Sequence, residues 1–202
     1  LEELGIADNT LVIYSTDHGD FCGGHGLIDK HFSMYDDIMR VPLMMRFPGR
    51  IKPGQACDAF VTNEIDVAKT ILTAAGVEAP VSFEGQDLVQ VLRGTLPGRD
   101  DIFAQYQGGE TGLYSCRMLR NREWKYVWNP TSPEDELYHL PSDPGEVRNR
   151  IEEPELQEEL QQLRLRLIAW MESIRDPLLN NFTRSLLDLS FPPIIRPGIL
   201  SS

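Results

Sequence analysis

An apolar strand that runs directly into an Asp-His-Gly turn is the feature that most constrains this chain. Residues 10–15, Thr-Leu-Val-Ile-Tyr-Ser, are rich in β-branched and apolar side chains, which is typical of a strand covered on both faces in an α/β sheet. Asp17 and His18 follow at the carboxyl end of this strand. In open α/β sheets, ligands bind in the crevice outside the carboxyl ends of the strands. The sequence therefore predicts an α/β fold with a ligand site at this turn.

The side chains of the turn suit a divalent metal. The carboxylate of Asp17 and the neutral imidazole of His18 can both donate electron pairs to one cation. Two ligands are too few for a complete site, so further ligands must come from elsewhere. Such a donor set fits calcium, magnesium, manganese or zinc. The alternative is a purely hydrogen-bonded turn, for which Asp, His and Gly are also common residues.

The residues after the turn favour an anion site. Three of the four histidines, His18, His25 and His31, lie in this short region together with four glycines and Lys30. Glycine lets a backbone approach a ligand closely, and a lysine supplies a mobile point charge that suits a tetrahedral anion. Metal-assisted chemistry on an anion is the interpretation that accounts for the whole region.

Several segments of the chain, in their order and spacing, resemble the sulfatases, which belong to the alkaline-phosphatase-like superfamily of metal-dependent sulfate and phosphate ester hydrolases. The resemblance extends from residue 1 to about residue 175. It rests on residues 16–19, 24–27, 30, 35, 40–43, 47–49, 66–72, 124–127, 136–140 and 143–146. It implies an α/β fold: the C-terminal part of an alkaline-phosphatase-like core sheet, followed by a small α+β subdomain with an antiparallel sheet and a long helix.

The resemblance also implies roles for individual residues. Asp17 and His18 would be metal ligands, with His18 where many relatives have Asn, and the expected metal is Ca²⁺, with Mg²⁺, Mn²⁺ or Zn²⁺ as alternatives. Lys30 and His25 would contact the sulfate or the leaving oxygen of a small-molecule or carbohydrate sulfate ester. A second role for His25, in stabilising the glycine-rich loop by hydrogen bonds, stays open.

The nucleophile that the resemblance implies is absent from this sequence. Relatives make a formylglycine from the Cys of a Cys-x-Pro/Ala-x-Arg motif, which lies with two further metal-binding aspartates in their N-terminal half. Cys22 and Cys57 have no Arg four residues later, and Cys116 has one but is followed by Met118 where Pro or Ala is required. Residues 116–120 also look like a strand, so Cys116 is rejected as the nucleophile.

This chain is therefore expected to be the C-terminal portion of a longer enzyme, inactive alone, with the missing N-terminal half as its partner. The first residues of the chain agree with this expectation, because Leu1 to Gly5 looks like the last turn of a helix. The tandem Asp36-Asp37 could imitate the missing metal-binding pair, although a solvated helix turn is the preferred interpretation.

Three functions stay open at this stage. Hydrolysis of sulfate esters is the principal prediction. A phosphonate monoester hydrolase or phosphodiesterase of the same superfamily is the enzymatic alternative. A noncatalytic fragment or interaction module is the third.

Composition narrows the choice of partners. The net charge of -12 over 202 residues argues against a general nucleic-acid or anionic-membrane surface. No apolar run approaches the roughly 20 residues that span a bilayer. Three scattered cysteines do not form a disulfide framework, which favours a reducing, cytoplasmic compartment.

The chain divides into three expected parts. Residues 1–97 form the partial sulfatase-like α/β core with the metal and anion loop. Its predicted helix starts at a cap, Thr62 or Asn63, ends at Gly76, and faces the sheet with Ile65, Ala68, Ile71, Leu72 and Ala75.

Residues 98–176 form the α+β subdomain. Its predicted strands are 102–106, 113–119, 124–128 and 136–140, and His139 is interpreted as structural. The helix predicted at 154–174 carries the apolar stripe Leu156, Leu160, Leu163, Leu167, Met171 and Ile174, which is expected to pack on the sheet. The proline-rich residues 177–202 form an extended tail docked on the core or on a neighbouring subunit, so a homo-oligomer stays open.

Overall fold

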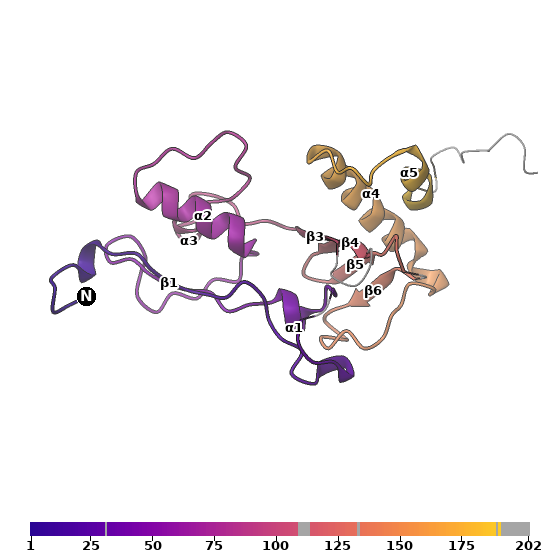
Figure 1. Cartoon of the computed structure of the whole chain (residues 1–202), viewed down its shortest axis with the longest axis horizontal. Helices are drawn as coiled ribbons and strands as arrows, with labels where there is room; N and C mark the ends of the chain where they lie inside the picture. The colour runs from indigo at the N-terminus through magenta and orange to yellow at the C-terminus, as the bar shows by residue number, and fades with distance from the viewer. Residues whose placement is uncertain (31, 109–113, 133, 189, 191–202) are drawn as a thin grey trace, which may run out of the picture. The chain divides into compact units, whose positions relative to one another are not determined.

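The structure is a computed structural model that describes residues 1–30, 32–108, 114–132, 134–188 and 190. The chain separates into two compact units, Leu1–Ile102 and Phe103–Ser202, called unit 1 and unit 2 below. Figure 1 labels most of the helices and strands of both units. No helix within the described ranges is long and apolar enough to cross a membrane.

Unit 1 combines a two-stranded sheet with short helices. Its elements are η1 (Ala7–Asn9), β1 (Val12–Tyr14), η2 (Gly24–Gly26), α1 (Asp36–Met39), β2 (Met44–Arg46), α2 (Asn63–Ala74) and α3 (Leu88–Leu92). Strands β1 and β2 are antiparallel, with Ile13 opposite Met45. The strand predicted at residues 10–15 and the helix predicted to end at Gly76 therefore exist in the expected places.

The prediction that β1 is covered on both faces is wrong for this chain. Val12 is exposed, and Tyr14 keeps 61% of its surface accessible. The reason is that the described part of the chain gives β1 only one neighbouring strand, so its side chains are not enclosed.

Helix α2 also differs from the prediction. Ile65, Ile71 and Ala75 are exposed, whereas Asp66 and Thr70 are fully buried. The buried polar face is satisfied, because Asp66 accepts a bidentate pair from Arg99 at 2.5 and 2.8 Å and Thr70 Oγ1 accepts from the backbone N–H of Leu88 at 2.9 Å. Buried polar groups are stable when they are hydrogen-bonded in this way. These polar contacts, rather than the apolar stripe, determine which face of α2 is buried.

The ends of α2 were predicted in part. Gly76 follows the helix with a φ of +69°, a left-handed conformation that glycine adopts without strain, as predicted. Thr62 occupies the N-cap position, but its side chain makes no capping hydrogen bond. The side chain of Asn63 bonds to another segment of unit 1. The side-chain cap predicted at Thr62 or Asn63 is therefore wrong.

Unit 2 is a four-stranded sheet with helices. Its elements are β3 (Ile102–Gly108), β4 (Tyr114–Arg120), β5 (Trp124–Trp128), β6 (Glu136–His139), η3 (Pro154–Leu156), α4 (Gln157–Ser173) and α5 (Asn181–Leu187). The strand order is β3-β4-β5-β6, and β5 pairs antiparallel with both β4 and β6. The four predicted strands and the long helix are confirmed, except that Leu113 lies outside the described residues.

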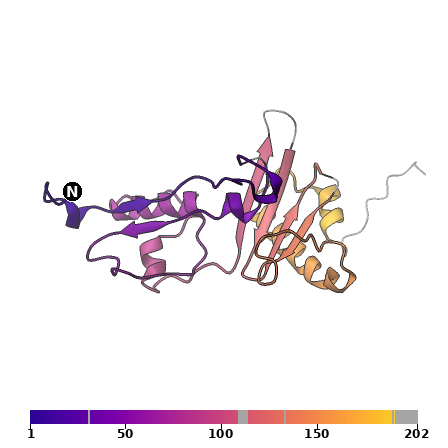
Figure 2. The same cartoon turned by 90° about the horizontal axis from the view of Figure 1, so that it is seen from below.

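The core of unit 2 lies between the sheet and α4 (Figure 2). Leu160, Leu163, Leu167 and Met171 are all buried, and they pack against sheet residues that include Tyr126. Burying one such side chain contributes about 1.5–3 kcal/mol. The predicted packing of this helix on its own sheet is confirmed.

The expectation of an extended tail from residue 177 is wrong for residues 181–187, which form α5. Asn180 caps this helix by accepting hydrogen bonds from the backbone N–H groups of Phe182 and Thr183, and Thr183 bonds back to the Asn180 N–H. This capping box starts a helix despite the nearby prolines. Leu187 is buried in the core, whereas Leu189 and residues 191–202 lie outside the described part.

Candidate functional site

The Asp17-His18 pair converges on one point of the turn after β1. His18 Nε2 lies 3.7 Å from Asp17 Oδ2, and Lys30 Nζ lies 3.2 Å from the same His18 nitrogen. His18 Nδ1 is 2.7 Å from the carbonyl oxygen of Gly19, so the N–H belongs on Nδ1 and the lone pair on Nε2. An imidazole fixed in this way presents Nε2 as a metal-binding atom.

Asp17 is held as a carboxylate. A hydrogen bond from its own backbone amide, the neighbouring His18 and a hydrogen bond from the Thr16 hydroxyl all lower the pKa of Asp17. The side chain is 73% exposed, so it is open to an incoming cation. A charged and accessible oxygen donor beside a nitrogen donor is suited to a hard or borderline divalent metal.

Gly19 lets this turn lie directly against α1. Its N–H donates to the carbonyl of Ile38 at 2.8 Å, and a Cβ at this position would lie 1.9 Å from the carbonyl oxygen of Asp37. Any larger residue would push the turn away from α1. The glycine of the Asp-His-Gly sequence is therefore required by packing.

The other side of the turn is bonded to α2, a contact that sequence reasoning missed. Ser15 Oγ lies 3.0 Å from Asn63 Oδ1, and Asn63 Nδ2 donates to the carbonyl of Thr16 at 2.9 Å. The position of Asn63 at the predicted start of a helix indicated only a cap. A polar side chain at a helix start that does not cap the helix is the signal that could have suggested a contact with another segment.

His25 lies in an aromatic cluster. Its ring stacks on Tyr35 with centroids 3.9 Å apart and meets Phe21 edge-on. His25 Nε2 is 3.9 Å from Asp37 Oδ2, and the His25 side chain is only 16% exposed. These contacts agree with the loop-stabilising alternative. The predicted role of His25 toward a leaving oxygen stays a prediction, and His31 lies outside the described residues.

The tandem acids form no metal-binding group with the other described residues. Asp36 and Asp37 open α1, and the Asp37 carboxylate faces His25. Among the described residues, no group of three or more His, Cys, Asp or Glu side chains is arranged to hold a metal. Asp17 and His18 would therefore need ligands from outside this set, as the sequence suggested.

Cys116 has the wrong environment for a nucleophile. It lies in β4, as predicted, and is fully buried. Burial raises the pKa of its thiol to about 12, so the reactive thiolate is absent at neutral pH. The two other cysteines, Cys22 and Cys57, are exposed and unpaired with each other.

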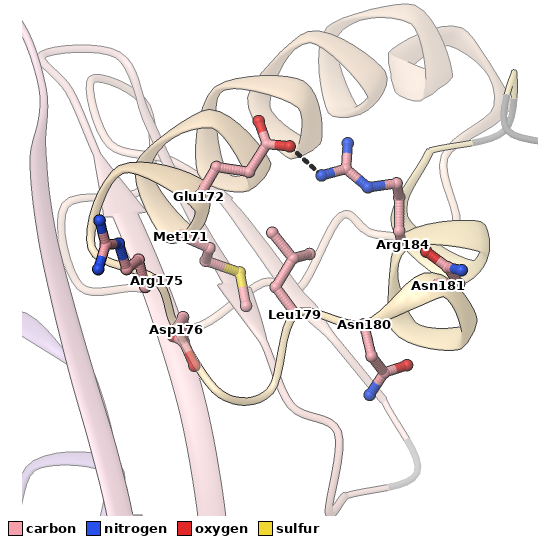
Figure 3. Close-up of a pocket in the computed structure, with 8 residues that line it drawn as sticks. All are labelled: Met171, Glu172, Arg175, Asp176, Leu179, Asn180, Asn181 and Arg184. Atoms are coloured by element: carbon pink, nitrogen blue, oxygen red, sulfur yellow. Dashed lines mark hydrogen bonds and ion pairs between the residues drawn. The ribbon is translucent and has the colours of Figure 1, made fainter.

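A hollow of about 400 Å³ in unit 2 has a different character. Figure 3 shows it between the end of α4 and α5, with an ion pair between Glu172 and Arg184 across it. Its second carboxylate, Asp176, is bonded to Arg117. Because both acids are already neutralised by arginines, this hollow offers no evident chemistry.

The fold defines the class of the protein. The alkaline-phosphatase-like α/β fold of this chain is that of solved sulfatase structures. Residues 23–183 match the family described as N-sulphoglucosamine sulphohydrolase, C-terminal, and the chain belongs to this sulfatase family.

Individual relatives agree with this assignment. The chain is 36% identical over 174 residues to an N-acetylglucosamine-6-O-sulfatase of Bacteroides thetaiotaomicron, covering 81% of this chain and 31% of that protein. A structure solved with its substrate D-glucosamine-2-N,6-O-disulfate superposes with a TM-score of 0.80 at 31% identity, covering 88% of this chain and 37% of the other. A phosphonate monoester hydrolase from Silicibacter pomeroyi gives 0.76 at 26% identity, covering 86% and 37%. The chain thus spans about a third of the length of the relatives it matches.

Proposed function

We propose that the protein carrying this chain hydrolyses sulfate esters, with a sulfated carbohydrate as the substrate class. The main support is that His18 Nε2 lies 3.7 Å from Asp17 Oδ2 and 3.2 Å from Lys30 Nζ. These three residues lie in a chain that belongs to a sulfatase family. The substrate class is supported by a relative named as an N-acetylglucosamine-6-O-sulfatase and by a structural neighbour solved with a sulfated glucosamine.

Asp17 and His18 would hold a divalent metal, and Ca²⁺ is the proposed ion. The exposed carboxylate and the Nε2 lone pair fit such a cation, provided that Lys30 Nζ moves away from Nε2. A bound divalent metal polarises a sulfate oxygen and stabilises an activated nucleophile. The remaining ligands and the nucleophile would come from residues outside this chain.

Lys30 would neutralise charge on the transferred group. It is exposed, it sits on a loop, and its ammonium already lies beside the metal-binding pair. Fixed positive charge placed where negative charge develops lowers the barrier to reaction. His25 would donate a proton to the departing alkoxide or phenoxide, with Asp37 orienting its ring.

Phosphonate monoester hydrolysis is the second candidate. A specific observation favours it, because the phosphonate monoester hydrolase from Silicibacter pomeroyi shares this fold at 26% identity. Sulfate and phosphonate esters are both tetrahedral anions, so the same lysine and metal could serve either one.

The test is turnover by the full natural protein that carries this sequence. The substrates are 4-nitrophenyl sulfate, 4-nitrophenyl phenylphosphonate and glucosamine 6-sulfate, each with Ca²⁺ and with a chelator. We expect Ca²⁺-dependent turnover that is fastest on the sulfates. Lys30→Ala should lower kcat by on the order of 100-fold or more, while circular dichroism stays unchanged, and Lys52→Ala serves as the matched control from an exposed lysine in the same unit.

Preference for the phosphonate would support the second candidate. Absence of turnover on all three substrates would support a noncatalytic role. Normal turnover by Lys30→Ala would remove Lys30 from the site.

A further inference from the structure

Asn63 joins α2 to the turn that carries the Asp17-His18 pair. It lies 47 residues along the chain from Thr16, yet its Nδ2 donates to the Thr16 carbonyl at 2.9 Å. Its Oδ1 lies 3.0 Å from Ser15 Oγ. One amide side chain thus contacts both residues that precede Asp17.

The orientation of this amide follows from its partners. The Thr16 carbonyl can only accept a hydrogen bond, so the NH₂ group of Asn63 must face it. The Asn63 oxygen then faces Ser15, whose hydroxyl can donate either to it or to the Pro42 carbonyl, each 3.0 Å away. An aliphatic side chain at position 63 could satisfy neither neighbour.

Asn63 is itself held in place. It is the first residue of α2, and it makes none of the capping contacts that a residue at this end of a helix often makes. The start of the helix is instead fixed by Asp66, whose carboxylate accepts from the Thr62 N–H at 2.7 Å and from Arg99. A buried, charge-assisted network of this kind is rigid. The side chain of Asn63 therefore projects from a firm base.

The opposite side of the turn is held by a second hydrogen bond. The N–H of Gly19 donates to the Ile38 carbonyl at 2.8 Å, at the end of α1. Asp17 and His18 thus lie between one anchor at residues 15–16 and another at residue 19. These two anchors restrict the backbone that carries Asp17 and His18.

We propose that Asn63 is the positioning residue of the metal-binding pair, holding the Ser15-Thr16 backbone so that Asp17 and His18 meet the same cation. The effect of Asn63 on metal binding rests on the proposed function, whereas the effect of Asn63 on the order of the turn does not. Residues that orient metal ligands typically change metal affinity by 10- to 100-fold when they are replaced.

The first test needs no metal. Amide hydrogen exchange at Gly19, which bonds to Ile38, reports the order of the turn in the metal-free full natural protein. Asn63→Ala should speed this exchange by about tenfold and leave the amides in the middle of α2 protected. Thr73→Ala, which removes a hydroxyl from the far end of the same helix, should leave Gly19 unchanged.

The second test measures Ca²⁺ affinity by calorimetry in the full natural protein. Asn63→Ala should weaken Ca²⁺ binding about 10- to 100-fold. Ser15→Ala should weaken it in the wild-type background and have a smaller effect in the Asn63→Ala background, because the two side chains share one contact.

Unchanged Gly19 exchange in Asn63→Ala would overturn the proposal, and so would loss of protection throughout α2, since the role would then be that of a general helix residue. Unchanged Ca²⁺ affinity in a protein that binds Ca²⁺ would also overturn it. If the wild-type protein binds no Ca²⁺, the proposed function fails, and the exchange at Gly19 still decides whether Asn63 orders the turn.

Discussion

Unit 2 and unit 1 use their apolar residues in opposite ways. In unit 2, the stripe on α4 is buried against the sheet, and the cluster includes side chains from β4, β5, β6 and α5. In unit 1, apolar residues of β1 and α2 such as Tyr14 and Ile71 are exposed, while the polar Asp66 and Thr70 are buried. The periodicity of apolar residues therefore predicts the buried faces of a unit that encloses its own core. It fails to predict them in unit 1, where the described sheet has only two strands.

The two units also differ in how they hold charge. Unit 2 buries Arg117 with Asp176 at 2.5 and 3.0 Å, and it buries Lys125 with Glu146. Unit 1 buries Asp66 with the partly exposed Arg99 and leaves Asp17 open to solvent. Buried and fully bonded pairs fix a structure, whereas an open carboxylate can still take a ligand.

The largest effect is expected from Asp176→Asn. This change leaves the buried Arg117 guanidinium without its counter-charge, which typically costs about 3–5 kcal/mol in the free energy of unfolding. All three tryptophans lie in unit 2, so urea unfolding followed by tryptophan fluorescence reports this unit. Arg148→Gln, which breaks an exposed pair with Glu153, should cost under about 1 kcal/mol. Equal losses in the free energy of unfolding for the two variants would contradict the distinction between buried and exposed ion pairs.

The next effect is expected from Asp66→Ala in unit 1. It removes the acceptor for Arg99 and for the N–H groups of Thr62 and Gln86, so a loss of about 2–4 kcal/mol is expected. Hydrogen exchange of the α2 amides should accelerate while the tryptophan transition of unit 2 stays in place. A shift of both signals together would mean that the two units unfold as one.

A pH titration should separate the units further. Burial raises the pKa of Asp176, but hydrogen bonds from Arg117 and from the Leu178 N–H, together with the Arg117 charge, outweigh it and lower the pKa. A carboxyl with a lowered native pKa stabilises the fold above its unfolded pKa, about 3.9. That contribution should be lost as pH falls below about 4, and Asp176→Asn should remove this part of the pH dependence. An identical acid transition in the variant would show that another group controls it.

The smallest effect is expected from Ile71→Ala. The side chain is 49% exposed, so the free energy of unfolding of the 202-residue chain should change by no more than about 0.5 kcal/mol. Hydrogen exchange of the α2 amides measures this change in the free energy of unfolding. A loss of about 2 kcal/mol or more, the cost of emptying a packed core position, would show that Ile71 is buried in solution.

The sequence predicted the elements of unit 2 well because strong local signals and tertiary packing agree there. The leucine stripe of α4 leads to a buried face, and all five residues of the predicted strand 124–128 are buried in β5. The helix α5 was missed because the four prolines of residues 177–202 were given more weight than the capping box at Asn180 and Thr183, although residues 178–191 contain no proline. The ion pair between Arg117 and Asp176 joins residues 59 positions apart, and no local pattern reports such a contact.

The candidate site was predicted as a set of residues but not as an arrangement. Asp17, His18 and Lys30 come together, as the spacing suggested. His25 packs with Tyr35 and Phe21, and its backbone is left-handed at φ +52°. Asn63 was missed because its partners are distant in sequence, and the capping preference of Asn at a helix start offered a sufficient local explanation.

The central claim is that the turn after β1 supplies the metal ligands of a sulfatase, and Ca²⁺ affinity of the full natural protein tests it most directly. Wild type is compared with Asp17→Ala and His18→Asn by calorimetry. We expect Asp17→Ala to weaken Ca²⁺ binding by on the order of 100-fold or more, whereas His18→Asn keeps it within about tenfold, because an amide oxygen is a good calcium ligand. Equal affinity in all three proteins would contradict the claim and return this turn to a structural role.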